Sequence, residues 1–263
     1  MKTDLWITPE QARTYVERGT GCGIRVAVLD SGIEVSHPEL AGITLRDDVA
    51  VTGDGVSLSF MPGGGRDVFG HGTAVAGIVR RLAPEAEIGS VRVLGEQLKS
   101  RTAVIRAGAR EAIRLGYHVL NCSFGCSVME QVLQYKDWVD EAYLHNVHVV
   151  AACNNFDSSK PEWPGYFSSV VTVNMAEVQD DRLFYQTGSL VEFVARGVNV
   201  EVPWRDGRKK EVTGSSFAAA HMTGLLARLL SEAPRLTPLQ VKALLRRFAS
   251  PWRASPTISK EPG

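Results

Sequence analysis

The sequence contains an aspartate, a histidine and a serine, the residue types that together carry out nucleophilic catalysis. They are Asp30, His71 and one of two adjacent serines, Ser215 or Ser216. Asp30 ends the apolar run IRVAVLD, His71 lies between two glycines in FGHGT, and the serines open an Ala-rich run. A serine hydroxyl is a weak nucleophile until a histidine accepts its proton, and a carboxylate orients that histidine. Each residue alone also has an ordinary explanation, as a turn or helix cap or as a structural histidine. Brought together, they would support acyl transfer.

The elements that would position these residues alternate along the chain. Short, Val-rich apolar runs predict strands, and helical spacing of apolar residues predicts helices. Continuous apolar strands alternating with helices indicate a parallel sheet covered on both faces, where ligands gather beyond the carboxyl ends of the strands. We expect one α/β domain over residues 1–250 and a loose tail over 251–263. The expected strands are 24–30, 88–94, 118–124, 147–153 and 170–174, and the expected helices are 71–82, about 101–115, about 130–145, 216–231 and 238–249.

The composition excludes several classes of function. The 263 residues include 29 basic and 29 acidic side chains, so no net charge favours nucleic acid or an anionic membrane. No apolar stretch reaches the roughly 18 residues that span a bilayer. The first residues, MKTDLWITPEQARTYVERG, lack the apolar core of a signal peptide, and we therefore expect a cytoplasmic protein. The oligomeric state is not indicated.

The other histidines and the cysteines carry no catalytic pattern. Cys122 and Cys126 could be combined with His118 as a metal site, but this spacing fits no common zinc pattern and Cys122 lies in an apolar strand. No metal or cofactor is expected. The residues interpreted as reduced thiols are Cys22, Cys122, Cys126 and Cys153, and the histidines interpreted as structural or surface residues are His37, His118, His145, His148 and His221.

Three local motifs resemble those of one enzyme family. The residues Asp30, His71 and Ser216 follow one another in the order Asp, His, Ser that is typical of subtilisin, with separations of 41 and 145 residues. The three motifs of that family are similar to the segments VAVLDSGI, GHGTAVAG and GSSFAAAHMTG. The chain thus resembles subtilisin-like (S8) serine proteases from about residue 20 to residue 248. The resemblance implies a three-layer α/β fold, with a mostly parallel central sheet and helices on both faces. It also implies an endopeptidase in which Ser216 attacks, His71 accepts the proton and Asp30 orients His71.

The same resemblance implies an oxyanion hole and a peptide-binding strand. After VVAA the family has Gly-Asn, whose asparagine side chain donates to the oxyanion, and AACNN matches Asn154 to it; Asn155 is the alternative after a one-residue shift. With these groups present, an inactive binding module is disfavoured. A peptide substrate would add as a strand along a short segment, with further residues as pocket walls. These residues are Ser123, Phe124 and Gly125 for the strand, and Ala152 and Cys153 for the walls.

A carboxylate is expected in the pocket for the residue before the scissile bond. Glu162 precedes Trp-Pro-Gly, where the family has a small residue, and its charge would favour Arg or Lys in that pocket. The alternative is a solvated surface glutamate.

Two departures from the family pattern bear on function. The Asn- and Gly-rich insertion that binds calcium in secreted relatives is missing from the segment GIVRRLAPEAEIGSVRVL, so we do not expect that calcium site. No folding pro-domain precedes the motifs, and we therefore expect an intracellular enzyme. Ala220 stands where the family has proline, which keeps a peptide ligase or macrocyclase as an alternative. Maturation of a dedicated precursor and general protein turnover both suit such an enzyme.

Overall fold

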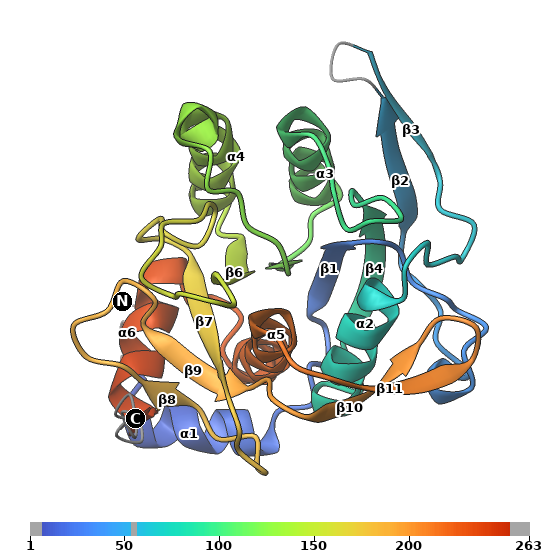
Figure 1. Ribbon diagram of the computed structural model, residues 1–263. Coiled ribbons are helices and arrows are strands. Elements are labelled where there is room, and N and C mark those ends of the chain that lie inside the picture. Colours follow the sequence, from blue (N-terminus) through green and yellow to red (C-terminus); the bar gives the residue numbers. More distant parts are fainter. Residues whose placement is uncertain (1–6, 54–56, 253–263) are drawn as a thin grey trace, which may run out of the picture.

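A computed structural model describes residues 7–53 and 57–252 of the chain, and its centre is a ten-stranded sheet (Figure 1). The strand order is β12-β8-β9-β7-β6-β5-β1-β4-β2-β3, and the pairs from β7 to β2 through β1 are parallel. The bounds are β1 Arg25–Asp30, β2 Asp48–Gly53, β3 Leu58–Pro62, β4 Glu87–Arg92, β5 Val119–Cys122, β6 His148–Ala152, β7 Val171–Ala176, β8 Phe184–Tyr185, β9 Phe193–Arg196 and β12 Ser250–Pro251.

Helices cover both faces of this sheet, as the alternation of side chains in β1 demonstrates. Val26 and Val28 belong to the apolar core on the side of α2 and α5, whereas Ala27 and Leu29 belong to the core on the side of α3 and α4. The expected three-layer α/β fold is therefore confirmed. The helices are α1 Pro9–Arg18, α2 His71–Leu82, α3 Thr102–Arg114, α4 Val132–Leu144, α5 Ser215–Glu232 and α6 Pro238–Phe248, with single turns η1 Pro38–Leu40 and η2 Met129–Gln131.

The helix α5 is almost wholly buried beneath the sheet. Close approach to α2 depends on glycine, because a Cβ at Gly224 would lie 2.6 Å from the Cβ of Leu82. A Cβ at Gly72 would likewise lie 2.1 Å from the carbonyl oxygen of Gly32. The small residues of the two helices thus allow their backbones to pack closely, as their sequence patterns indicate. None of the helices in the described ranges is long and apolar enough to cross a membrane.

Several elements differ from the sequence-based expectation. The helix α1 was not expected, although Thr8, Pro9 and Gln11 form its capping box and first turn. Pro251 and Trp252, expected in a loose tail, extend the sheet instead: β12 pairs with β8, and Trp252 packs edge-on against Phe184. The rest of that tail, 253–263, lies outside the described residues.

A separate two-stranded sheet lies beside α2. Its strands are β10 Val200–Trp204 and β11 Arg208–Val212, which pair antiparallel. Figure 1 shows this hairpin along the α2 side of the molecule, leading directly into the start of α5. The hairpin therefore connects the surface near His71 with the segment that carries Ser216.

Candidate active site

His71 and Asp30 form a buried hydrogen-bonded pair at the carboxyl end of β1. The Nδ1 atom of His71 lies 2.9 Å from each carboxylate oxygen of Asp30. Asp30 is fully buried and His71 is 6% exposed. Burial alone would lower the pKa of His71, but the charge and hydrogen bond of Asp30, with the charge of Asp67 added, hold this pKa above its usual 6.5. With Nδ1 bound to Asp30, Nε2 is the ring nitrogen left for a substrate.

A second carboxylate, which the sequence analysis did not single out, orders the loop before His71. Asp67 accepts hydrogen bonds from the backbone N–H groups of Phe69, Gly70 and Thr73 at 2.7–2.9 Å and from the hydroxyl groups of Ser31 and Thr73 at 2.7 Å. These bonds fix the turn from which α2 starts. Asp67 is thus a positioning residue for His71, and its place four residues before His71 is the only signal that the sequence contains.

Ser216 lies in the first turn of α5, close to the strand segment after β5. Its hydroxyl donates to the carbonyl oxygen of Ser123 at 3.2 Å, and the hydroxyl of Ser123 donates to the carbonyl oxygen of Ser216 at 3.2 Å. The ring of the next residue, Phe217, lies 5.3 Å from the ring of His71. Catalytic hydrogen bonds are often long or poorly aligned without substrate, so the bond from Ser216 to Ser123 does not exclude a later bond from Ser216 to His71.

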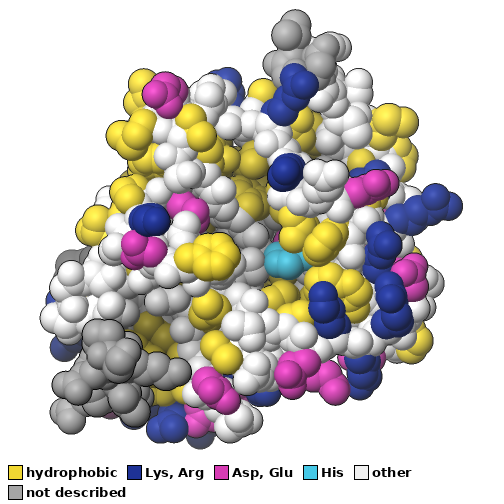
Figure 2. All heavy atoms as spheres, viewed as in Figure 1, with side chains coloured by type: hydrophobic (Ala, Val, Ile, Leu, Met, Phe, Trp, Pro, Cys, Tyr) yellow, Lys and Arg dark blue, Asp and Glu magenta, His cyan; other side chains and the backbone are white. Residues whose placement is uncertain are grey.

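One cavity contains both His71 and Ser216. It has a volume of about 500 Å³ and is bordered on one side by Ser123, Phe124 and Gly125. Figure 2 shows this face, with one histidine side chain in a central hollow surrounded by apolar side chains. Its remaining lining residues are Leu94, Leu98, Asn155, Trp204, Lys210, Glu211, Val212, Thr213, Gly214 and Phe217.

The two adjacent asparagines occupy different places. Asn155 lines the cavity, and its Oδ1 accepts the N–H of Ser215 at 2.8 Å and lies 2.8 Å from the Ser215 hydroxyl. Asn154, which was expected at the oxyanion, instead points its Nδ2 at Glu162 and uses its Oδ1 to accept the N–H groups of Phe156 and Asp157. The reason is local: β6 ends at Ala152, and only the second asparagine of the following turn faces α5.

Glu162 lies directly behind Gly125, the last residue of the segment expected to bind peptide. Its Oε1 accepts a 2.8 Å hydrogen bond from Asn154, and a Cβ on Gly125 would lie 2.4 Å from its Oε2. The side chain is partly buried. The two residues expected as pocket walls, Ala152 and Cys153, are both buried, and neither lines the catalytic cavity. The Ser215 hydroxyl donates to the carbonyl oxygen of Cys153 at 2.7 Å.

A chain of buried hydrogen bonds supports the site from below. Thr223 in α5 donates to the side-chain oxygen of Asn121 at 2.9 Å, and Asn121 donates to the hydroxyl of Ser123 at 2.8 Å. Because Ser123 bonds Ser216 in turn, this chain connects the core of α5 with its first turn through β5. Thr223 and Asn121 were not singled out from sequence.

The remaining histidines and cysteines make contacts away from the cavity. His221 is buried, its Nε2 lies 2.9 Å from a guanidinium nitrogen of Arg81, and burial lowers its pKa to about 4. Burial also lowers the pKa of His148 to about 4 and raises that of Cys153 to about 12. The four cysteines are free thiols. Within the part of the chain that the structure describes, no three His, Cys, Asp or Glu side chains are grouped as a metal would require.

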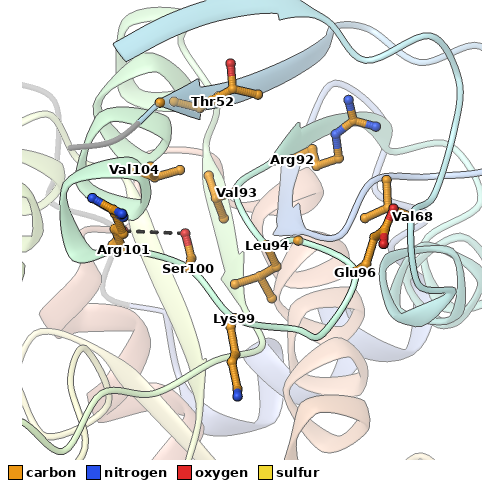
Figure 3. Close-up of a pocket in the computed structure, with 13 residues that line it drawn as sticks. Thr52, Val68, Arg92, Val93, Leu94, Glu96, Lys99, Ser100, Arg101 and Val104 are labelled. Atoms are coloured by element: carbon orange, nitrogen blue, oxygen red, sulfur yellow. Dashed lines mark hydrogen bonds between the residues drawn. The ribbon is translucent and has the colours of Figure 1, made fainter. Parts of the chain in front are cut away.

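A second cavity, of about 540 Å³, shares Leu94 with the catalytic one (Figure 3). It lies between the end of β2, the end of β4 and the start of α3, and its apolar lining residues include Val93, Leu94 and Val104. In Figure 3 the Lys99 side chain extends away from the other labelled side chains. Neither His71 nor Ser216 lines this cavity.

Comparison with known proteins places these features in a family. The model of the subtilase family matches residues 21–262. Subtilisin BL of Lederbergia lenta is 32% identical over 257 residues, which cover 93% of this chain and 90% of the relative. M-protease of Shouchella clausii (strain KSM-K16) is 31% identical over 257 residues, and the match covers 93% of this chain and 64% of the relative's length.

Solved structures agree with the sequence comparison. The crystal structure of a cold-adapted subtilisin-like serine proteinase matches with a TM-score of 0.72 and 27% identity, covering 88% of this chain and 83% of that one. Sphericase, at 24% identity, has the same fold with a TM-score of 0.72, covering 90% of this chain and 88% of that one. The family model, the relatives and the fold lead to one conclusion: the chain belongs to the subtilase family and is a subtilisin-like serine endopeptidase.

Proposed function

We propose that Ser216 is the nucleophile of this endopeptidase, that His71 is its general base and that Asp30 orients His71. The observation that supports this assignment is that His71, which is bound to the buried Asp30 at 2.9 Å, lines the same cavity as Ser216. Ser216 Oγ bonds the substrate carbonyl carbon while its proton passes to His71 Nε2. His71 then protonates the leaving amine as the C–N bond breaks, and water hydrolyses the acyl-enzyme by the same route.

We assign the oxyanion donor to Asn155. Its Oδ1 is held by Ser215, which leaves Nδ2 as the group that can face the cavity. A donor fixed in this way needs no reorganisation when charge develops on the substrate oxygen. Asn154 has a competing partner in Glu162, which argues against the same role for it.

We further propose that the enzyme prefers Arg or Lys before the scissile bond. A substrate that pairs with Ser123–Gly125 places its side chain near the wall formed by Gly125, and the Glu162 carboxylate lies against that wall. Asn154 occupies one carboxylate oxygen and leaves the other for a substrate cation. A basic preference would suit maturation of a dedicated precursor in the cytoplasm, for which the four free thiols are a supporting observation.

Capture of the acyl-enzyme by an amine is a second candidate activity. The helix α5 runs unbroken from Ser215 to Glu232 through the fully buried Ala220, where a proline would interrupt its hydrogen bonds. An alanine N–H can donate to the carbonyl oxygen of Ser216 and so shift the acyl group slightly. Ala220→Pro is then expected to lower the ratio of amide to acid product when an amine is supplied; an unchanged ratio would remove this candidate.

The first experiment is fluorophosphonate labelling read by mass spectrometry, followed by digestion of a peptide library. Labelling at Ser216, loss of cleavage in Ser216→Ala, and cleavage after Arg and Lys would support the whole assignment. Labelling with equal cleavage after Leu and Arg would remove the role of Glu162 alone. If the folded protein is not labelled, the catalytic assignment is wrong.

A further inference from the structure

The hairpin β10–β11 forms one wall of the catalytic cavity. Trp204, at the end of β10, and Lys210, within β11, both line the cavity that contains His71 and Ser216. We call these two side chains the hairpin pair. Lys210 does not stand out in the sequence, because it is one of several charged residues in the strand RKKEV.

Trp204 is held in place beside His71. Its ring packs edge-on against Phe69, with 5.7 Å between ring centroids. It also lies against Gly70, the residue directly before His71: a Cβ there would be 2.7 Å from the indole ring, so no larger side chain fits. The indole is therefore a fixed part of the surface next to the catalytic histidine.

Lys210 adds a positive charge to this surface. Its Nζ lies 4.4 Å from the centroid of the Trp204 ring, a cation–π contact that restrains the ammonium over the indole. Among the described residues no carboxylate pairs with Lys210, whereas its neighbour Lys209 pairs with Glu39 and Glu201. The charge of Lys210 is thus available to a ligand in the cavity.

Glu211 is the carboxylate nearest in sequence that also borders the cavity. Consecutive residues of a strand project to opposite faces, so the Glu211 carboxylate and the Lys210 ammonium point away from each other. Residues directly opposite each other in the two strands share a face of the hairpin. Glu211 is opposite Glu201 and Lys210 is opposite Val202, so Glu211 and Lys210 belong to different faces.

The position of the hairpin pair relates it to one part of a substrate. His71 gives a proton to the departing amine, so the residues after the scissile bond leave along the His71 side of the cavity. The acyl part lies along Ser123–Gly125, and the hairpin pair stands beside His71. We propose that Trp204 and Lys210 form a site for an acidic side chain in the first residues after the scissile bond. This inference rests on the catalytic assignment proposed above.

The same site would select the amine that captures an acyl-enzyme. A nucleophile occupies the space that the leaving group vacates, so an amine whose first residues carry Asp or Glu binds there by the same contact. The acyl-enzyme gives either an acid or an amide, and the partition between them reports binding of the amine without any contribution from the acyl side.

The test compares peptides that are identical except for Asp, Ala or Lys at each of the first three positions after the scissile bond. The intact protein should cleave the Asp peptides with a kcat/KM about two- to fivefold higher than the Lys peptides at one of these positions, as expected for one partly exposed ion pair. Lys210→Glu should reverse this order, and 1 M salt should reduce it. In ester aminolysis, Asp-containing amines should give more amide than Lys-containing amines.

Lys209→Glu is the matched control, because it makes the same charge change one residue away on a lysine that does not line the cavity. It should leave the preference unchanged. Two results would overturn the proposed site for an acidic side chain while leaving the catalytic assignment standing. One is hydrolysis that does not depend on these charges, and the other is an equal effect of Lys209→Glu and Lys210→Glu. Absence of hydrolysis and of labelling at Ser216 would instead overturn the catalytic assignment.

Discussion

The side-chain amide of Asn154 donates a 2.8 Å hydrogen bond to the carboxylate of Glu162. This bond fixes one oxygen of a carboxylate that lies behind Gly125, at the edge of the proposed peptide-binding segment. The pair therefore acts as a unit, in which the amide sets the direction of the charge.

Removal of the Glu162 charge should change the preference for Arg over Leu before the scissile bond more than it changes the rate for Leu substrates. Glu162→Gln should lower kcat/KM for substrates with Arg before the scissile bond by about 10- to 150-fold, because a hydrogen bond to a charged group is worth about 1.5–3 kcal/mol. Substrates with Leu should be affected much less. Glu232→Gln, at the exposed far end of α5, is the control. An equal loss for Arg and Leu would refute the proposed pocket.

Substitution of the two asparagines should separate their roles. Asn155→Ala should lower kcat by about 10²–10³ with little change in KM, as removal of one oxyanion donor does in subtilisin. Asn154→Ala should keep kcat for Leu substrates but reduce the advantage of Arg, since Glu162 loses its partner. Steady-state kinetics with matched Arg and Leu peptides measures both; a uniform fall in kcat for Asn154→Ala would return the oxyanion role to Asn154.

The raised pKa of His71 predicts a particular pH dependence. Neutral His71 is the proposed base, so kcat/KM should rise with pH through a pKa above 6.5. The same shift adds stability that is present below pH 6.5 and lost as pH rises through the folded-state pKa. Asp30→Asn removes the negative charge that offsets the effect of burial on the pKa of His71. The acidic limb of the kcat/KM profile should therefore move to lower pH, while kcat falls about 10⁴-fold. A limb that does not move would show that Asp30 does not set this pKa.

The buried chain that ends at Ser216 predicts a loss of stability on changing Thr223. Thr223→Val removes the donor to Asn121 and leaves a buried acceptor unsatisfied, which should cost about 1–3 kcal/mol. In a chain of this size each kcal/mol lowers Tm by about 2–4 °C. Thr223→Ser keeps the hydroxyl and should retain most of the stability, as calorimetry or urea unfolding can measure. Equal Tm values for the Val variant and the parent would refute the role of this hydrogen bond.

The parts of the fold that are repeated and apolar are the parts that the sequence predicts well. The helix α2 was expected at 71–82 and spans His71–Leu82, and β1 was expected to end at Asp30 and does so. In both, burial of a continuous apolar pattern decides the structure, and that pattern is local. The strand β11, RKKEV, is short and polar and has no such pattern, so the β10–β11 hairpin was missed.

The finer features of the site depend on contacts between distant segments. Whether Asn154 or Asn155 faces α5 is decided by where β6 ends and by the hydrogen bonds of Ser215, sixty residues later. The proximity of Trp204 and Gly70 is likewise a matter of packing across more than a hundred residues. A single sequence does not contain these contacts, so it does not decide between Asn154 and Asn155, which differ by one residue in register.

The burial of α5 has a consequence for how the enzyme is inactivated by heat. Its first turn carries Ser216, the proposed nucleophile, and most of the helix lies in the larger of the two described apolar cores, so Ser216 should lose its position only when that core unfolds. Enzymatic activity and the integrity of the core should therefore disappear at the same temperature. Residual activity would then serve as a direct readout of the fraction of molecules that are still folded.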